Sequence, residues 1–241
     1  MGRYQRIAEL ADLTHPDLRV ADLATGAGRQ VRAMLAVAAP GVRIHAVDAA
    51  SSLDDEVLHD ARVRSMIADL DEPLPFSDGT LDRVVSLNVA EHLADPAAHL
   101  AQCHRVLIPG GLLVLAHSDW DTALFTSEDD ALTRLLVDRF VSTVPTFAAR
   151  ADGFMGRKLL GLAADSPFDL VGVDTWADCH RRFDQDSVAW KVAIGVLAAA
   201  KDEPALTVRA TAWVESLVRL SAAGRFLFTV TDVAVVLRRA G

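Results

Sequence analysis

The stretch RVADLATGAGRQV, residues 19–31, places an acidic residue, Asp22, near the end of an apolar run and two glycines shortly after it. Gly26 and Gly28 precede a segment in which apolar residues recur at helical spacing. A glycine at such a turn lets a ligand approach the backbone closely, because no side chain stands in the way. The amide groups that open a helix favour an anionic group of the ligand. The pattern predicts a turn that cradles a nucleotide.

Two further acidic residues follow apolar runs. Asp48 comes 22 residues after Gly26, where a carboxylate can accept hydrogen bonds from both hydroxyls of a ribose. Asp69 ends the next run, where a carboxylate can accept from an exocyclic amine such as that of adenine. A dinucleotide-binding turn carries a third glycine, but Val31 occupies that position here. One acid at each strand end and no third glycine indicate an adenosine with a short zwitterionic tail.

Candidate catalytic side chains follow the next two apolar runs. His92 and His117 could each act as a general base if a nucleophile must lose a proton, and each could instead be a structural histidine. Asp119 precedes Trp120 and Asp121, and an aromatic ring flanked by acids could hold an amine or another cation. The alternative is a tryptophan that packs an insertion onto the core.

Positioning these residues requires a sheet whose strands end at one edge. Apolar runs typical of buried strands occupy residues 18–24, 41–49, 63–69, 81–89 and 112–119. Helical patterns separate several of them, most clearly at 29–39 and at 95–107, where Asp95 is a capping residue and Pro96 the first helical residue. This alternation predicts an α/β fold with a doubly wound, parallel sheet covered by helices on both faces.

Composition narrows the classes of function. The chain has 33 Asp and Glu against 24 Lys and Arg, a net charge of −9, which disfavours a nucleic-acid partner. Cys103 and Cys179 lie outside any CxxC or His/Cys cluster, so we expect no metal site and no disulfide framework. No apolar run approaches the roughly 18 residues that span a bilayer. We therefore expect a cytoplasmic protein without a membrane partner.

Five motifs in order give residues 18–118 a close resemblance to the class I S-adenosylmethionine-dependent methyltransferases, especially the group typified by ubiquinone and menaquinone biosynthesis enzymes. The motifs are DLATGAG (22–28), the acids Asp48 and Asp69, LPFSDGTLD (74–82), NVAEHLADP (88–96) and RVLIPGG (105–111). Ala24 stands where the family has its first glycine. The resemblance implies a mostly parallel, seven-stranded sheet, with an antiparallel seventh strand between the fifth and sixth, contained in residues 225–239.

The resemblance also implies S-adenosylmethionine as cofactor and a role for each matching residue. The methionine part of the cofactor would contact the turn after the first strand, the ribose the end of the second, the adenine the end of the third and the sulfonium the end of the fourth. The implied residues are, in that order, Asp22, Ala24, Thr25, Gly26 and Gly28, then Asp48 and Ala49, then Asp69 and Leu70, then Asn88. Asp71 is an alternative to Asp69.

The activity implied by the resemblance is methyl transfer to an O, N or C atom of a small-molecule acceptor, by a monomer or a homodimer. His117, His92 and Asp119 are the catalytic candidates. Two alternatives remain: a non-methylating S-adenosylmethionine binder, regulatory or cyclase, and a nicotinamide-dependent oxidoreductase. The missing third glycine and the acid at position 69 disfavour the oxidoreductase.

We expect one domain over residues 1–241, with a cofactor-binding half at about 18–118. Residues 120–167 are interpreted as a helical insertion after strand five, a candidate lid. Residues 168–241 complete the sheet and add acceptor-side helices, with a strand at 168–176, helices at 187–200 and 204–224, and a strand or pair of strands at 225–239. Aromatic residues of these parts suit a partly apolar acceptor but are also typical of a core: Phe125, Phe140, Phe147, Phe154, Trp176, Trp190 and Trp213.

Overall fold

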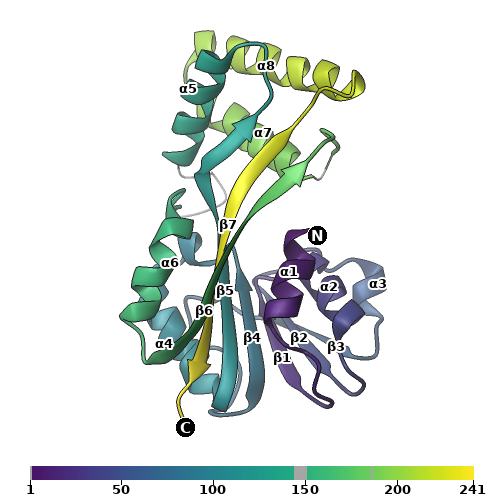
Figure 1. The fold of residues 1–241 in the computed structure, drawn as a ribbon, viewed down its shortest axis with the longest axis vertical. Helices are drawn as coiled ribbons and strands as arrows, with labels where there is room; N and C mark the ends of the chain where they lie inside the picture. Colours follow the sequence, from purple (N-terminus) through teal and green to yellow (C-terminus); the bar gives the residue numbers. More distant parts are fainter. Residues whose placement is uncertain (1, 144–150, 186) are drawn as a thin grey trace. The chain divides into compact units, whose positions relative to one another are not determined.

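Seven segments of the chain form one sheet. The computed structural model describes residues 2–143, 151–185 and 187–241. The strands are β1 (Arg19–Leu23), β2 (Arg43–Asp48), β3 (Val63–Ile67), β4 (Leu81–Leu87), β5 (Leu107–Phe125), β6 (Phe168–His180) and β7 (Phe228–Arg239). Their order across the sheet is β3-β2-β1-β4-β5-β7-β6 (Figure 1). The predicted seven-stranded α/β sheet is confirmed.

The first five strands are parallel and reverse their order at β1. This strand pairs with both β2 and β4, while β2 pairs with β3, and β4 with β5. In such a sheet ligands bind beyond the carboxyl ends of the strands, at the point where the order reverses. Asp22, Asp48 and Asn88 are near the carboxyl ends of three of these strands, as their predicted roles require.

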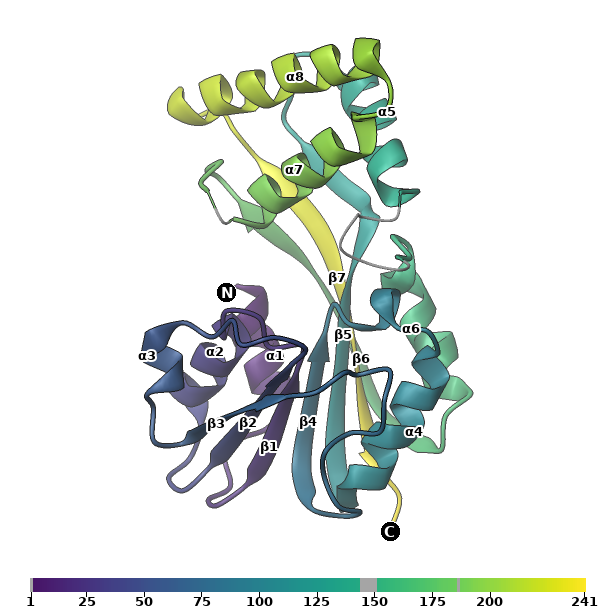
Figure 2. The same cartoon turned by 180° about the vertical axis from the view of Figure 1, so that it is seen from behind.

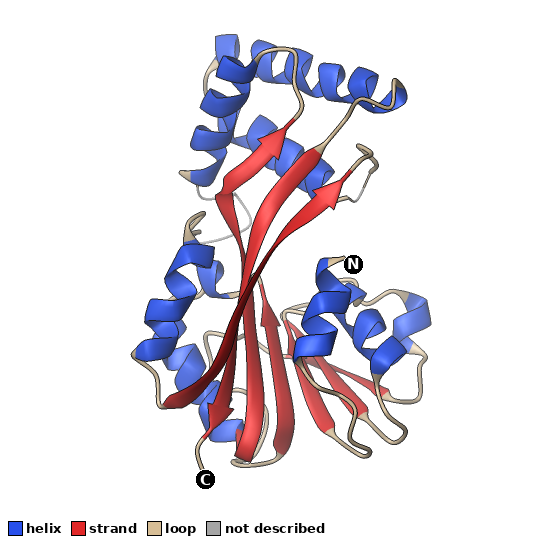
Figure 3. Ribbon diagram, in the orientation of Figure 1, coloured by secondary structure: helices blue, strands red, loops and turns tan. Residues whose placement is uncertain are grey.

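Helices cover both faces of the sheet (Figure 3). They are α1 (Arg3–Leu10), α2 (Arg29–Val37), α3 (Asp55–Leu58), α4 (Pro96–Val106), α5 (Asp130–Val141), α6 (Met155–Ala164), α7 (Val188–Ala200) and α8 (Pro204–Ala222), with a 3₁₀ turn at Ala90–His92. Helices α1 and α2 pack together on one face of β1 to β3, and α4 lies on the opposite side of the sheet (Figures 1 and 2).

Helix α4 begins as its sequence predicts. Pro96 occupies the first turn, and the Asp95 carboxylate accepts a hydrogen bond from the amide of Ala98 at 3.0 Å. Proline is tolerated there because the amide it lacks would have no partner within the helix.

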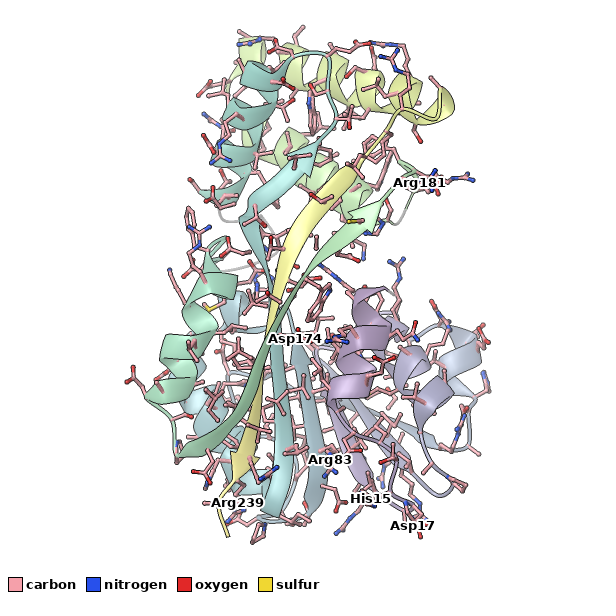
Figure 4. All side chains as sticks on the ribbon, in the orientation of Figure 1. His15, Asp17, Arg83, Asp174, Arg181 and Arg239 are labelled. Carbon is pink, nitrogen blue, oxygen red and sulfur yellow. The ribbon has the colours of Figure 1, made fainter. Side chains whose placement is uncertain are left out.

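The N-terminal helix, α1, was not predicted. Arg83 of β4 donates to the carbonyl of Ala11, just after the helix, at 2.8 Å. Arg6 of the helix donates to Asp174 of β6 at 2.7 Å. Figure 4 labels Arg83 and Asp174. These side-chain bonds, together with packing against α2, fix a helix that is short for independent stability.

The described residues gather into two compact units. The first comprises residues up to 117, 157–175 and 233–241, and the second comprises 118–156 and 176–232. Strands β5, β6 and β7 run from one unit into the other. The second unit has its own core, in which the Phe125 ring lies 5.0 Å from that of Trp213 and 4.7 Å from that of Phe228. Phe125 and Trp213 are therefore core residues.

The fifth strand extends past both of its predicted ends. The Pro109–Gly111 stretch, expected to stop the preceding helix, lies within β5, where the register against β4 shifts. Gly110 has a φ of +80°, which only glycine adopts easily. At the other end Ala123 and Phe125 are buried and Leu124 between them is exposed, the period-two pattern of a strand.

The predicted helical insertion at 120–167 therefore begins only after residue 125, and it contains α5 and α6. Residues 144–150 of that segment, Phe147 among them, lie outside the described residues. The predicted strand at 225–239 is one strand, β7. It lies between β5 and β6 and is antiparallel to both (Figure 1). No helix in the described residues is both long and apolar enough to cross a bilayer. The organisation as one domain stays a prediction.

Candidate functional site

The turn after β1 adopts the left-handed conformations that its glycines predict. Gly26 has a φ of +55° and Gly28 a φ of +85°. Ala24 also lies in this region, with a φ of +56°, although its Cβ makes that conformation unfavourable by about 1 kcal/mol. The amide of Thr25 donates to the carbonyl of Val47 at 3.1 Å, so the turn is tied to the end of β2.

The two glycines of the turn are needed for different reasons. A Cβ added to Gly26 would meet no atom within 4 Å, so the space beside this backbone is open to a ligand. A Cβ added to Gly28 would lie 2.9 Å from Leu53 and 3.0 Å from Val57. At position 28 the positive φ and the close packing of Leu53 and Val57 both favour glycine, and the approach of a ligand stays a prediction.

Asp22 is buried within the sheet, with 2% of its surface exposed. Its neighbours in register are Ala46 of β2 and Val85 of β4, and its Oδ2 has no hydrogen-bond partner among the described residues. Burial raises the pKa of Asp22 to about 7, against the lowering effect of Thr25, and the nearby Asp48 carboxylate adds to the rise. A buried carboxylate oxygen without a partner is costly, and a cationic group would relieve that cost.

Asp48 holds the same turn from the end of β2. Its Oδ2 accepts from the amide of Gly26 at 2.7 Å, and its Oδ1 accepts from the amide of Ala50 at 3.3 Å. A carboxylate has about four acceptor positions, so capacity remains for two ribose hydroxyls. Ala49 follows directly and is exposed.

The loop after β3 separates the two acids that the sequence left as alternatives. Asp69 is exposed, and its Oδ1 accepts from the amide of Asp71 at 3.0 Å. Asp71 in turn accepts from the amide of Ala94 at 2.7 Å, which ties this loop to the one after β4. Asp71 is thus engaged in holding two loops together, whereas the second oxygen of Asp69 has no partner among the described residues.

His99 of α4 lies close to this loop and was missed by the sequence reasoning. Only 3% of its surface is exposed. Burial lowers the pKa of His99 to about 4, opposed by the backbone of Leu70 and the charge of Asp71. The imidazole is therefore neutral, and neither ring nitrogen has a hydrogen-bond partner among the described residues. A histidine on the buried face of a predicted helix was the only available signal.

The segment after β4 brings a second strained residue to this edge. Asn88 has a φ of +56°, and its amide donates to the carbonyl of Ala116 in β5 at 3.0 Å. Asparagine tolerates left-handed backbone better than most residues. The turn directs the chain into the 3₁₀ turn that carries Glu91 and His92.

Glu91 brings the two candidate histidines together. Its Oε1 lies 3.4 Å from Nε2 of His92 and 3.6 Å from Nε2 of His117. Glu91 and His117 are buried, and the His92 side chain is about one-third exposed. A carboxylate beside an imidazole orients the ring and stabilises the imidazolium that forms when the ring accepts a proton. The sequence reasoning assigned no role to Glu91, whose signal was its place in the EHL motif.

Asp119 belongs to the second unit, whereas all predicted cofactor residues and both histidines belong to the first. It is buried, and a Cβ added to Gly156 would lie 2.8 Å from it. The Trp120 ring packs edge to face on Phe140 at 6.2 Å. These contacts favour the packing alternative for Trp120 over a role in holding a cation.

No group of three or more His, Cys, Asp or Glu side chains in the described residues could hold a metal ion. Both cysteines are free thiols. Burial raises the pKa of Cys103 to about 12, so this thiol is inert, and Cys179 is exposed.

The sequence of this chain is similar to those of known methyltransferases. A family model described as a methyltransferase domain matches residues 21–115. An uncharacterized 37.1 kDa transposon protein of Streptomyces fradiae is 30% identical over 160 residues, 63% of this chain and 44% of its own length. A ubiquinone biosynthesis O-methyltransferase of Xanthomonas campestris is 34% identical over 119 residues, 46% of this chain and 47% of its own length. The chain thus spans less than half of these curated relatives.

Among solved structures, the YcgJ protein of Bacillus subtilis aligns with a TM-score of 0.62 at 16% identity. The alignment covers 99% of this chain and 98% of that one. Such a likeness confirms the fold.

Replacing Ala24 with glycine should stabilise the protein. The change removes the Cβ from a left-handed residue, so the free energy of unfolding should rise by about 1 kcal/mol, less what glycine loses in chain entropy. Ala27→Gly in the same turn, where φ is not positive, is the control and should give no gain. Urea unfolding of the three proteins measures the difference, and a loss of stability for Ala24→Gly would contradict the strain assigned to this residue.

The burial of Asp22 predicts a pH dependence of stability. Because its pKa rises from 3.8 to about 7 on folding, the folded state binds the proton more tightly, and stability is lost as the pH rises from 4 through 7. Asp22→Asn should remove this contribution. The ligand-free variant should exceed wild type at pH 8 by on the order of 2–4 kcal/mol, with the difference vanishing near pH 4. If the difference in the free energy of unfolding between the variant and wild type stays constant from pH 4 to pH 8, Asp22 does not have the raised pKa that its burial predicts.

Proposed function

We propose that this chain, which belongs to the class I S-adenosylmethionine-dependent methyltransferases, transfers a methyl group from S-adenosylmethionine to an O, N or C atom of a small-molecule acceptor. S-Adenosylhomocysteine is the second product. The observation that carries this proposal is the buried Oδ2 of Asp22, which has no partner among the described residues at the edge where the strand order reverses.

The residues at this edge fit the cofactor. The ammonium group of its methionine part would provide the cation that Asp22 lacks, and its carboxylate would meet the amides that open α2. The open space beside Gly26 admits the close approach this requires. Asp48 retains acceptor capacity for the ribose, and Asp69 for the adenine amine. Asn88 would line the sulfonium.

The bound cofactor supplies a methyl group on a positively charged sulfur. The protein contributes mainly by aligning the acceptor and excluding water, because the attack is an in-line displacement that needs little covalent help. A proton must leave only when the attacking atom carries one, as in a hydroxyl. His117 is the residue that we assign to take that proton, and the Glu91 carboxylate, with Oε1 3.6 Å from Nε2, would stabilise the charge that the ring then carries.

We assign to this protein a partly apolar acceptor, a cytoplasmic location, and action as a monomer or a homodimer. The non-methylating alternative would use the same cofactor residues, so binding with no turnover on any acceptor would favour it. The oxidoreductase alternative requires a preference for a nicotinamide cofactor.

Calorimetric titration with S-adenosylhomocysteine, with NAD and NADP as controls, tests the cofactor. Wild type should bind S-adenosylhomocysteine alone. Asp48→Ala should weaken this binding by about 1–3 kcal/mol, the scale of lost charge-assisted hydrogen bonds. Asp169→Ala, which removes an exposed carboxylate from β6, should leave the affinity unchanged. Equal affinities for both variants would remove Asp48 from the site, and a preference for NAD would reject the proposed cofactor.

Turnover separates the base from the cofactor residues. With any acceptor that makes wild type release S-adenosylhomocysteine, His117→Gln should lower kcat by about 10²-fold or more while leaving S-adenosylhomocysteine affinity nearly intact. Glu91→Gln should lower kcat less, and Glu91→Asp should restore part of the loss. His15→Gln, at an exposed histidine (Figure 4), is the control. Equal losses of turnover and cofactor affinity would instead give His117 a structural role.

A further inference from the structure

The amino-terminal parts of β1, β2 and β3 carry basic side chains on one face of the sheet. Arg19 of β1 is in register with Arg43 of β2, and His45 of β2 is in register with Arg64 of β3. Side chains alternate between faces along a strand, and residues in register share a face. These four side chains therefore project from the same face of three adjacent strands.

None of the described residues that line this part of the sheet belongs to a helix. The connection from β3 to β4, residues 68–80, contains none, and it lies on the same side of the sheet as α4 (Figure 2). Arg105 of α4 fixes the connection by donating to the carbonyls of Leu74 and Phe76 at 3.0 and 2.8 Å. A hollow of about 560 Å³ remains between strands and connection, with Arg19, Arg43, His45, Arg62, Arg64 and Phe76 among its lining residues.

Positive charge predominates in this hollow, in a chain whose net charge is −9. The Asp82 carboxylate lies at its border, where it accepts from the backbone amide of Arg19 at 2.8 Å. Arg62 is paired with Asp60 at 2.8 Å. The guanidinium groups of Arg19, Arg43 and Arg64 have no side-chain partner among the described residues. Burial, and then the charges of Arg64 and Arg19, lower the pKa of His45. The positive charges of these arginines thus act on His45, which lines the hollow. Because the positive charges repel one another, an anionic ligand that binds among them is favoured.

We propose that this hollow, the arginine groove, binds a small anion that carries two or more phosphate groups. Arg19 and Arg43 lie on neighbouring strands, about 4.8 Å apart, so both can reach one phosphate. Arg64, one strand further and displaced along it, meets the next phosphate. Guanidinium is the side-chain group best suited to phosphate, because it donates two parallel hydrogen bonds. The Phe76 ring, packed edge to face on His45 at 5.3 Å, provides an apolar wall beside the arginines.

The arginine groove is separate from the proposed cofactor residues. Along β2, Arg43 begins the strand and Asp48 ends it, which at roughly 3.3 Å per residue is a separation of about 16 Å. The inference therefore does not depend on the proposed methyl transfer. The alternative to anion binding is that the aliphatic parts of the arginine side chains cover apolar surface while their guanidinium groups stay in water.

Titrations of the full-length protein at low salt with pyrophosphate, ADP and adenosine test the inference. Pyrophosphate and ADP should bind, adenosine should not, and saturating S-adenosylhomocysteine should leave pyrophosphate binding in place. The Arg43→Gln/Arg64→Gln double variant should lose about tenfold or more in affinity. The control is Arg181→Gln/Arg209→Gln, which removes the same charge from exposed arginines of the second unit; Figure 4 labels Arg181.

A readout that needs no variant accompanies these titrations. In NMR spectra of wild type, pyrophosphate should shift the His45 imidazole resonances and raise the pKa of His45, because an anion offsets the arginine charges. Tighter binding of ADP than of pyrophosphate would identify a nucleotide as the source of the phosphates, and the reverse would identify a free polyphosphate. Equal affinities in the groove and control variants, an unmoved His45, or displacement by S-adenosylhomocysteine would each overturn the inference.

Discussion

A carboxylate buried inside a parallel sheet is the constraint on which the rest of this edge depends. Asp22 lies between apolar neighbours on β2 and β4, where a charge is expensive. The chain must then leave the sheet at once, through left-handed backbone at Ala24 and Gly26. Neither the buried carboxylate nor the left-handed backbone favours folding by itself. Both persist because the surrounding sheet determines the path of the chain, and such costs are typical of binding sites.

The end of β2 supplies the restraint that this turn needs. The Val47 carbonyl accepts from Thr25, and the Asp48 carboxylate accepts from Gly26. Asp48 thus has a structural role in addition to the proposed contact with ribose. The two roles are compatible, because the Gly26 amide uses only one of the acceptor positions of the carboxylate. If Asp48 also contacts the ribose as proposed, the order of the turn is coupled to occupancy of the site.

The sequence was sufficient to locate the strands, because buried parallel strands are continuous apolar runs, and capping residues mark helices such as α4. The place of the seventh strand came from the family resemblance. The sequence failed at the end of β5, where residues from Trp120 onward were interpreted as the start of an insertion although the strand continues to Phe125. Their strand conformation depends on pairing across the sheet, which local propensity does not contain. It also missed α1, whose position depends on the distant residues Arg83 and Asp174.

The same division applies to the site. The acids at strand ends are local signals, since each follows an apolar run. The pairing of Glu91 with His117 joins the segment after β4 to the strand β5, and no spacing in the sequence announces it. The packing of Leu53 and Val57 beside Gly28 was not predicted, because these contacts come from another segment of the chain. Residue types were therefore predictable where one segment determines them, and their partners were not.

The distribution of charge along β1 to β3 follows from the same geometry. Carboxylates gather at the ends of these strands, where amides of the following turns can donate to them, as Gly26 does to Asp48. The arginines lie at the other end, on a face where no helix of the described residues lines the hollow. Opposite ends of one short sheet thus present opposite charge, suited to a cationic group at one end and an anionic group at the other. The two regions lie about 16 Å apart along β2, at roughly 3.3 Å per residue, so their ligands need not compete for space.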